Sequence, residues 1–161
     1  MNRILASIAA VALGLCAFAQ SQLSTTEKAN PNDDTFIDMA VSAGKQAKAA
    51  GEKPCGTVVI LNGAWKATGT PSATATAEEN AISKSRLKSL KGARVYTVFE
   101  PTTRALVALT KAGADAVYYA VTSDDAVEAG IYKQEEYIPS DSATIPAIWV
   151  DYIPALDLMS K

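Results

Sequence analysis

Residues 95–121, VYTVFEPTTRALVALTKAGADAVYYAV, decide the fold class of this 161-residue chain. The stretch belongs to an apolar run at 94–99, a helix-forming segment at 103–112 and a second apolar run at 115–121. Two strand-like runs joined by one helix are typical of parallel strands with a crossover helix. The sequence therefore predicts an α/β domain around this unit.

The segments before this unit predict a helix, a β-hairpin and a second helix. The first helix, of about 16 residues, has an N-cap aspartate and a glycine stop. The Asn-Gly pair between two apolar runs is a strong hairpin signal. In chain order these elements are a helix from Asp33 or Asp34 to Gly51, strands at 56–61 and 64–69, and a helix from Thr76 to Lys91.

After this unit the pattern predicts a helix at 124–129, a last strand within 143–152 and a short terminal helix at 153–161. Adjacent residues of a strand point to opposite faces, so one of Tyr118 and Tyr119 is expected in the core and the other at the surface. The whole order predicts a mixed five-stranded sheet with an N-terminal hairpin and parallel crossovers.

The first nineteen residues, MNRILASIAAVALGLCAFA, predict a secretory signal peptide. Arg3 precedes an apolar run, and Ala17-Phe18-Ala19 gives the small-x-small cleavage pattern. The alternatives are a membrane anchor, for which the run is short, and a lipoprotein through Cys16, for which Leu15 is too large. We expect export to the periplasm or the medium, a flexible leader at 20–33 and one domain at 34–161.

Composition excludes several kinds of site. The chain has no histidine, and only Cys55 follows the predicted cleavage site, so the usual His and Cys zinc sets and Ser-His or Cys-His nucleophile pairs are absent. An all-carboxylate metal site stays open. Cleavage would change the net charge from −2 to −3, which gives no attraction for nucleic acid or an anionic membrane.

The element order resembles the cytidine deaminase-like fold, a three-layer α-β-α architecture. Zinc-dependent members carry His-x-Glu at the start of the second helix, where this chain has Thr76-Ala77-Glu78. They carry Pro-Cys-x-x-Cys at the start of the third, where this chain has Pro101-Thr102-Thr103-Arg104-Ala105. The segments ADAVYYAVTSDDAVEAGI and GEKPCGTVVILNGAWKATG are similar to the guanine deaminase and tRNA adenosine deaminase branch.

The resemblance implies roles for single residues. Glu78 stands at the position of the proton-shuttling carboxylate, and the zinc positions are Thr76, Thr102 and Ala105, none of which is a good zinc ligand. The base-holding Asn of this branch has no clear match at Gly69-Thr70. We therefore expect no zinc cofactor and no hydrolytic deamination.

Arg104 suggests what could replace the metal. We expect its guanidinium to pair with Glu78 in the former metal space, within a pocket that Glu100 also lines, since a buried unpaired carboxylate is costly. The simpler alternatives are that Glu78 is an ordinary first-turn glutamate, that Arg104 is a surface charge, and that Thr76 and Thr102 are N-caps.

Cys55 and the late aromatic residues favour structural roles. Cys55 is expected to be a small core residue, with an interchain disulfide as the alternative. Tyr132, Tyr137 and Trp149 are expected in the chain's own core, and closing a pocket or a homodimer interface is the alternative that the resemblance implies.

Three functions remain open at this point. The first is an exported pseudoenzyme that binds a small polar ligand such as a nucleobase, or a partner, through the emptied pocket. The second is an active nucleobase or nucleoside deaminase that uses Glu78 with an atypical metal or none. The third is a purely structural secreted domain.

Overall fold

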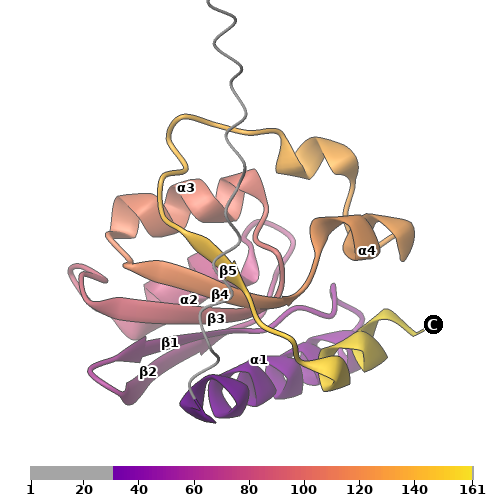
Figure 1. Ribbon diagram of the computed structural model, residues 1–161, viewed down its shortest axis with the longest axis horizontal. Helices are drawn as coiled ribbons and strands as arrows, with labels where there is room; N and C mark the ends of the chain where they lie inside the picture. Colours follow the sequence, from indigo (N-terminus) through magenta and orange to yellow (C-terminus); the bar gives the residue numbers. More distant parts are fainter. Residues whose placement is uncertain (1–30, 161) are drawn as a thin grey trace, which may run out of the picture.

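A five-stranded sheet with strand order β2-β1-β3-β4-β5 organises the protein (Figure 1). The computed structural model describes residues 31–160. The predicted signal peptide at 1–19 and most of the leader at 20–33 lie outside the described residues. Helices cover both faces of the sheet, so the expected three-layer α-β-α architecture is confirmed.

The regular elements follow the predicted order. They are α1 (Pro31–Ala49), β1 (Thr57–Leu61), β2 (Ala64–Gly69), α2 (Ala77–Ser85), β3 (Ala93–Phe99), α3 (Thr103–Ala112), β4 (Ala116–Val121), α4 (Ser123–Glu128), the 3-10 helix η1 (Gln134–Tyr137), β5 (Ala147–Trp149) and the 3-10 helix η2 (Ile153–Met159).

The sheet is mixed, as the hairpin and crossover signals predict. β1 pairs antiparallel with β2 and with β3, whereas β3, β4 and β5 run parallel. The carboxyl ends of the three parallel strands therefore meet at one edge. In open α/β sheets this edge is where ligands bind.

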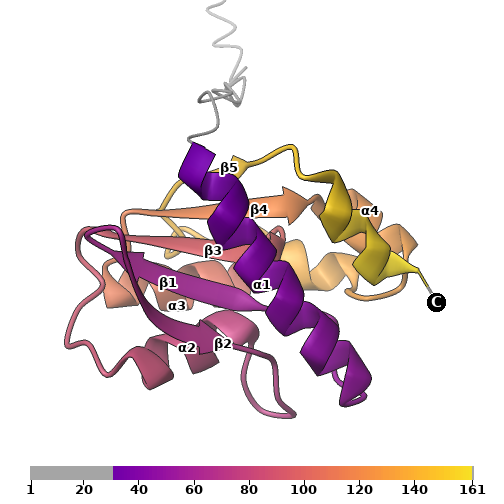
Figure 2. The same ribbon diagram turned by 90° about the horizontal axis from the view of Figure 1, so that it is seen from below.

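Alternating side chains build one core on each face of the sheet. Val58 and Tyr96 belong to the core beneath α1 and η2, which lie side by side (Figure 2). Val59, Val95 and Leu109 belong to the core beneath α2 and α3. Tyr118 and Tyr119 point to opposite faces as expected: Tyr118 is buried in the first core, and Tyr119 is half-buried on the other face.

Two glycines let helices approach the sheet closely. A Cβ atom on Gly56 would lie 2.1 Å from the Ala40 carbonyl oxygen of α1. A Cβ atom on Gly69 would lie 2.1 Å from the Ala77 carbonyl oxygen at the start of α2. Any side chain at either position would push a helix away from the sheet.

The N-terminus of α1 corrects one boundary. The sequence predicted a start at Asp33 or Asp34, but the helix already includes Pro31. Proline suits the first turn of a helix because its nitrogen needs no hydrogen-bond partner there. Asp33 is buried, and its Oδ1 accepts a hydrogen bond from the Tyr96 hydroxyl at 2.6 Å, which fixes this end of α1 to β3.

The C-terminus of α2 corrects another. The helix was predicted to continue to Lys91 but ends at Ser85, because Arg86 adopts a left-handed conformation with φ 54°. The apolar residues that extended the helical pattern, Leu87 and Leu90, still pack into the core from an irregular segment. The spacing of these two leucines therefore reflects their burial in the core and not a helical conformation.

The last third contains shorter elements than expected. The final strand spans only Ala147–Trp149, and η1 was not predicted.

Cys55 is a free, buried thiol with 2 % exposure, which confirms the core interpretation. Trp149, which was expected in the core, is 41 % exposed. Between residues 31 and 160 no helix is both long and apolar enough to cross a membrane.

Candidate functional site

A pocket of about 620 Å³ lies where the N-termini of α2 and α3 meet. The loop at 71–75, the cap residues Thr76 and Thr102, and Tyr132 all line it. Its charged lining residues come from both signs: Lys53, Arg104, Glu135 and Glu136. The pocket is therefore polar at its rim, with neutral hydroxyl groups at the two helix ends.

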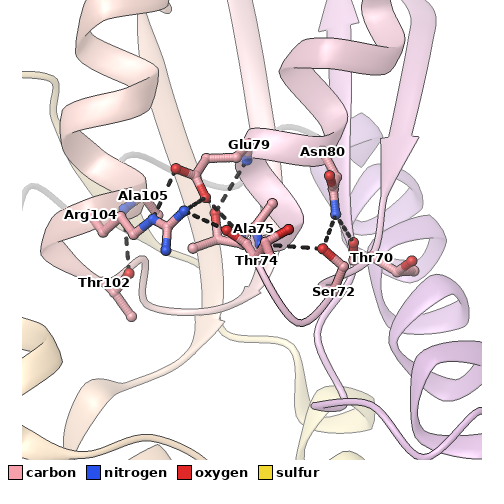
Figure 3. Close-up of polar contacts among 10 residues, drawn as sticks. Thr70, Ser72, Thr74, Ala75, Glu79, Asn80, Thr102, Arg104 and Ala105 are labelled. Carbon is pink, nitrogen blue, oxygen red and sulfur yellow. Dashed lines mark hydrogen bonds and ion pairs between the residues drawn. The ribbon is translucent and has the colours of Figure 1, made fainter.

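Both helix ends are closed by threonine caps. Thr76 Oγ1 accepts from the Glu79 backbone N–H at 3.2 Å, while Glu79 Oε2 accepts from the Thr76 N–H at 2.8 Å, which completes a capping box. Thr102 Oγ1 accepts from the Ala105 N–H at 3.3 Å (Figure 3). The two hydroxyl oxygens are thus used to satisfy the first backbone donors of their helices.

Arg104 pairs with Glu79, which corrects the ion pair predicted with Glu78. Its Nε donates to Glu79 Oε1 at 2.9 Å, and a terminal nitrogen donates to the Thr74 carbonyl at 2.7 Å (Figure 3). The Arg104 side chain is 61 % exposed. It therefore fastens the 71–75 loop at the rim and does not enter a buried metal space.

The other end of this loop is held by Asn80. Its side-chain amide donates to the Thr70 carbonyl at 2.8 Å and lies 3.4 Å from the Ser72 hydroxyl (Figure 3). Side chains of α2 and α3 thus fix the loop at both ends. These contacts order the pocket wall that the loop forms.

Glu78 lies below the pocket and not in its lining. Its carboxyl group is buried, with 4 % exposure of the residue, and Oε1 accepts from Thr97 Oγ1 of β3 at 2.8 Å. Thr97 Oγ1 lies 3.0 Å from Thr57 Oγ1 and 3.6 Å from Cys55 Sγ. Since Thr97 has one hydroxyl proton and gives it to Glu78, Thr57 is the donor in the pair of threonines.

Tyr132 and Tyr137 lie near this buried group and contact each other. Their rings meet edge to face with centroids 6.1 Å apart. Burial raises the pKa of Tyr132, and the neighbouring Cys55 and Glu78 raise it further. Lys53 Nζ lies 4.1 Å from the Tyr132 ring centroid and 3.2 Å from Glu136 Oε1. The Lys53 ammonium group therefore lies over the face of the Tyr132 ring.

Comparison with solved structures identifies the family, although no family sequence model and no curated protein sequence matches the chain. The chain is 31 % identical to a guanine deaminase from Bacillus subtilis, with 80 % of this chain and 90 % of that one covered and a TM-score of 0.59. This chain belongs to the cytidine deaminase-like superfamily.

Two further relatives of the superfamily share the fold. A tRNA:A34 deaminase matches at 24 % identity over 74 % of this chain and 99 % of its own, with a TM-score of 0.58. A protein solved with 8-azaguanine, and separately with 2,6-diaminopurine, matches at 19 % identity over 79 % of this chain with a TM-score of 0.69. The match spans 83 % of the chain solved with 8-azaguanine and 79 % of the chain solved with 2,6-diaminopurine.

The superfamily's zinc does not fit the residues of this pocket. The three zinc positions that the motif order assigns are Thr76, Thr102 and Ala105, which supply two hydroxyls already used as caps and one methyl group. Zinc sites in proteins use thiolate, imidazole or carboxylate ligands. Within residues 31–160, no group of three or more His, Cys, Asp or Glu side chains could hold a metal ion.

The predicted site residues of this superfamily member fall into three places. Thr76, Thr102 and Arg104 line the pocket, whereas Ala105 and Glu78 are buried behind it. Glu100 lines a neighbouring cavity on the other side of Thr103.

Sequence reasoning missed Glu79. The pattern Thr76-x-x-Glu79 is a capping-box signal that could have revealed it. Tyr132 was expected in the core, with closing a pocket as the alternative, and it lines the pocket. The sequence could not place Tyr132 there, because its position depends on how the segment after α4 returns to the pocket.

Proposed function

We propose that this protein is a non-hydrolytic member of the superfamily that binds a small polar ligand, such as a nucleobase, in the pocket between α2 and α3. The observation that carries this proposal is the use of Thr76 and Thr102 as helix caps at positions where the superfamily holds zinc. A hydroxyl that accepts a backbone N–H and carries no charge is a poor ligand for a divalent cation.

The energetic argument against hydrolysis is large. Zinc lowers the pKa of a bound water from 15.7 to about 7, and that shift supplies the hydroxide that attacks the ring. Without it, on the order of 10 kcal/mol of nucleophile activation is lost, at about 1.4 kcal/mol for each pKa unit. General base catalysis contributes roughly 100-fold to 10,000-fold, which offsets less than about half of this loss.

The position of Glu78 strengthens the argument. A general base must come within hydrogen-bond reach of the proton that it accepts. Glu78 instead holds the Thr97 hydroxyl beneath Tyr132, outside the pocket lining. The same carboxyl group is therefore part of a structural hydrogen-bond chain.

Ligand binding needs none of the lost parts. The pocket has a volume of about 620 Å³, and its lining includes the two threonine caps and charged side chains of both signs. Related structures of this fold hold 8-azaguanine and 2,6-diaminopurine, which supports a planar, nitrogen-rich ligand of that size.

Thermal unfolding of the purified protein with guanine, 8-azaguanine, 2,6-diaminopurine and cytidine tests binding. A ligand at 100 times its dissociation constant adds about 2.7 kcal/mol, which raises the melting temperature by several degrees in a domain of this size. Ala73→Trp, which fills the pocket, should remove the shift. Ala64→Trp, on an exposed alanine of β2, should keep it. No shift with any ligand would contradict the binding proposal.

An ammonia-release assay on the same compounds, with and without added zinc, tests the loss of chemistry. We expect no release above the uncatalysed rate under either condition. Release that requires Glu78, shown by its loss in Glu78→Gln, would establish an active deaminase instead and would sink the non-hydrolytic assignment.

We also propose that the protein is exported, with residues 1–19 removed. The support is the charged start, apolar run and Ala-Phe-Ala pattern of those residues. N-terminal sequencing of protein recovered from the periplasm and the medium should begin at Gln20. Recovery of the uncleaved chain from the cytoplasm would overturn this.

A homodimer is the assembly that the superfamily resemblance favours for this protein. Sedimentation equilibrium of the purified protein tests it, and a single species of monomer mass would contradict it.

A further inference from the structure

A second cavity, of about 740 Å³, lies beyond Thr103 and is roofed by residues 138–146, here called the strap. The strap is tied to α3 at two points. Thr103 Oγ1 donates to the Ile138 carbonyl, and Thr110 Oγ1 accepts from the Thr144 backbone N–H at 3.1 Å. Residues seven apart lie on one face of a helix, so both hydrogen bonds attach the strap to the same face of α3.

Aromatic rings form the wall that the sheet supplies. Tyr119 of β4 and Trp149 of β5 are direct partners in the parallel register, so their side chains stand next to each other on one face. Trp149 Nε1 donates to the Ala120 carbonyl at 3.1 Å, which fixes the orientation of the indole ring. Tyr137 of η1 adds a third ring to the lining.

One charged side chain, Glu100, lines the cavity. Its Oε2 accepts from the Ser123 backbone N–H at 2.8 Å, which holds the carboxylate at the carboxyl end of β3. Burial raises the pKa of Tyr119 to about 12, and the charge of Glu100 contributes to that rise. Burial also raises the pKa of Tyr137, and the same carboxylate raises it further. The carboxylate therefore lies close enough to act on both phenol groups.

Tyr137 contributes its ring to the cavity and not its hydroxyl. Among the described residues, this hydroxyl is the buried side-chain polar atom that has no hydrogen-bond partner. Because the oxygen is inaccessible, a ligand in the open cavity would meet the ring.

We infer that this cavity binds a small organic cation, with an ammonium group held between the Glu100 carboxylate and the faces of Trp149 and Tyr119. Aromatic faces attract cations, and tryptophan does so most strongly. A lining with one carboxylate and no basic side chain repels anions. A divalent metal ion would find one carboxylate where its usual sites supply several oxygen ligands. This site is separate from the pocket between α2 and α3, whose charged lining residues are Lys53, Arg104, Glu135 and Glu136.

The two tryptophans of the chain make a direct test possible. Trp65 is exposed on β2, so Trp65→Phe leaves Trp149 as the single tryptophan reporter. In that background, fluorescence titrations with tetramethylammonium, choline and benzylammonium are compared with uncharged analogues that carry carbon or oxygen in place of the cationic nitrogen. We expect saturable changes with at least one cation and binding of its uncharged analogue that is weaker by about ten-fold or more.

Two glutamate variants then identify the charge that matters. Glu100→Gln keeps an oxygen for the Ser123 N–H and should weaken cation binding roughly ten-fold to hundred-fold. Glu52→Gln makes the same change in net charge at an exposed glutamate outside the cavity and should leave binding unchanged. Unchanged circular dichroism and melting temperature would show that Glu100→Gln remains folded.

Three results would overturn the proposal: no binding of any of the three cations, equal affinity for charged and uncharged partners, or affinity that is insensitive to Glu100→Gln. Calorimetric titration of choline into Trp149→Leu provides a second check, and full affinity there would remove the indole from the site. Because the nucleobase pocket is a different site, 8-azaguanine should not displace a bound cation. Failure of the nucleobase proposal would therefore leave the cation result unaffected.

Discussion

Thr97 donates its hydroxyl proton to the buried carboxyl group of Glu78 across 2.8 Å, and this contact links β3 to the first turn of α2. The residue at the superfamily's proton-shuttle position is therefore engaged by the sheet beneath it. Thr57, 3.0 Å from Thr97, extends the chain of hydrogen bonds to β1. In this protein Glu78, which stands at the proton-shuttle position, connects the helix layer of α2 to the sheet.

Thr97→Val should destabilise the protein by about 1–3 kcal/mol, because it leaves a buried carboxyl group without its donor. Urea unfolding measures the change. In a Glu78→Met background the carboxyl group is absent, so the same valine should cost much less. An equal cost in both backgrounds would show that the Thr97–Glu78 contact contributes nothing.

Glu79→Ala should cost more stability than Arg104→Ala. The ion pair between them is largely exposed, and such pairs contribute about 0–1 kcal/mol. Glu79 also accepts the Thr76 N–H in the capping box, and loss of a cap costs roughly 0.5–2 kcal/mol. Urea unfolding ranks the two variants, and a larger loss of stability for Arg104→Ala would contradict this prediction.

Hydrogen exchange should show faster exchange at 72–75 in Arg104→Ala, since the Thr74 carbonyl loses its donor.

Restoring the superfamily's zinc ligands should restore zinc binding. We expect zinc to raise the melting temperature of the triple variant Thr76→His, Thr102→Cys, Ala105→Cys by several degrees, as expected for a ligand that binds the folded state. Zinc should leave the unmodified protein and the cap-free control Thr76→Ala, Thr102→Ala unchanged. A triple variant that ignores zinc would show that these positions do not converge as the motif order implies.

Alkaline pH should weaken the fold through Cys55. Burial raises the pKa of this thiol from 9.0 to about 12, so between these values the unfolded chain loses a proton that the folded chain keeps. The free energy of unfolding then falls as pH rises, by at most about 1.4 kcal/mol per pH unit from this group. Urea midpoints measured at about pH 8 and about pH 11 should show a shallower decline for Cys55→Ala. Parallel declines in the two proteins would exclude Cys55 as a cause.

The sequence predicted the order of elements well because each one carries a local signal. Asn62-Gly63 marks the hairpin, and the alternation from 94 to 121 marks the parallel unit. The end of α2 could not be predicted, because Leu87 and Leu90 keep an apolar spacing while Arg86 breaks the helix. Periodicity reports which residues are buried, and an irregular segment can bury them as well as a helix can.

The site was predicted in position but not in its contacts. The motif order located the two helix starts, and the structure places Thr76 and Thr102 together in one lining. The partner of Arg104 was missed because Glu78 and Glu79 are neighbours in the sequence but point about 100° apart on a helix. Glu78 faces the sheet and Glu79 faces the pocket rim, and the sequence does not indicate which of them lies near Arg104.

The close approaches at Gly56 and Gly69 show that backbone contacts set the spacing between the layers of this fold. Those glycines set the distance of α1 and α2 from the sheet through contacts with Ala40 and Ala77, and none of these contacts involves a side chain at a zinc position. Substitutions at Thr76, Thr102 and Ala105 leave these contacts in place, whereas a side chain at either glycine would displace a helix. The architecture is therefore uncoupled from the chemistry of the site, so one arrangement of layers can carry different sets of side chains at the helix N-termini.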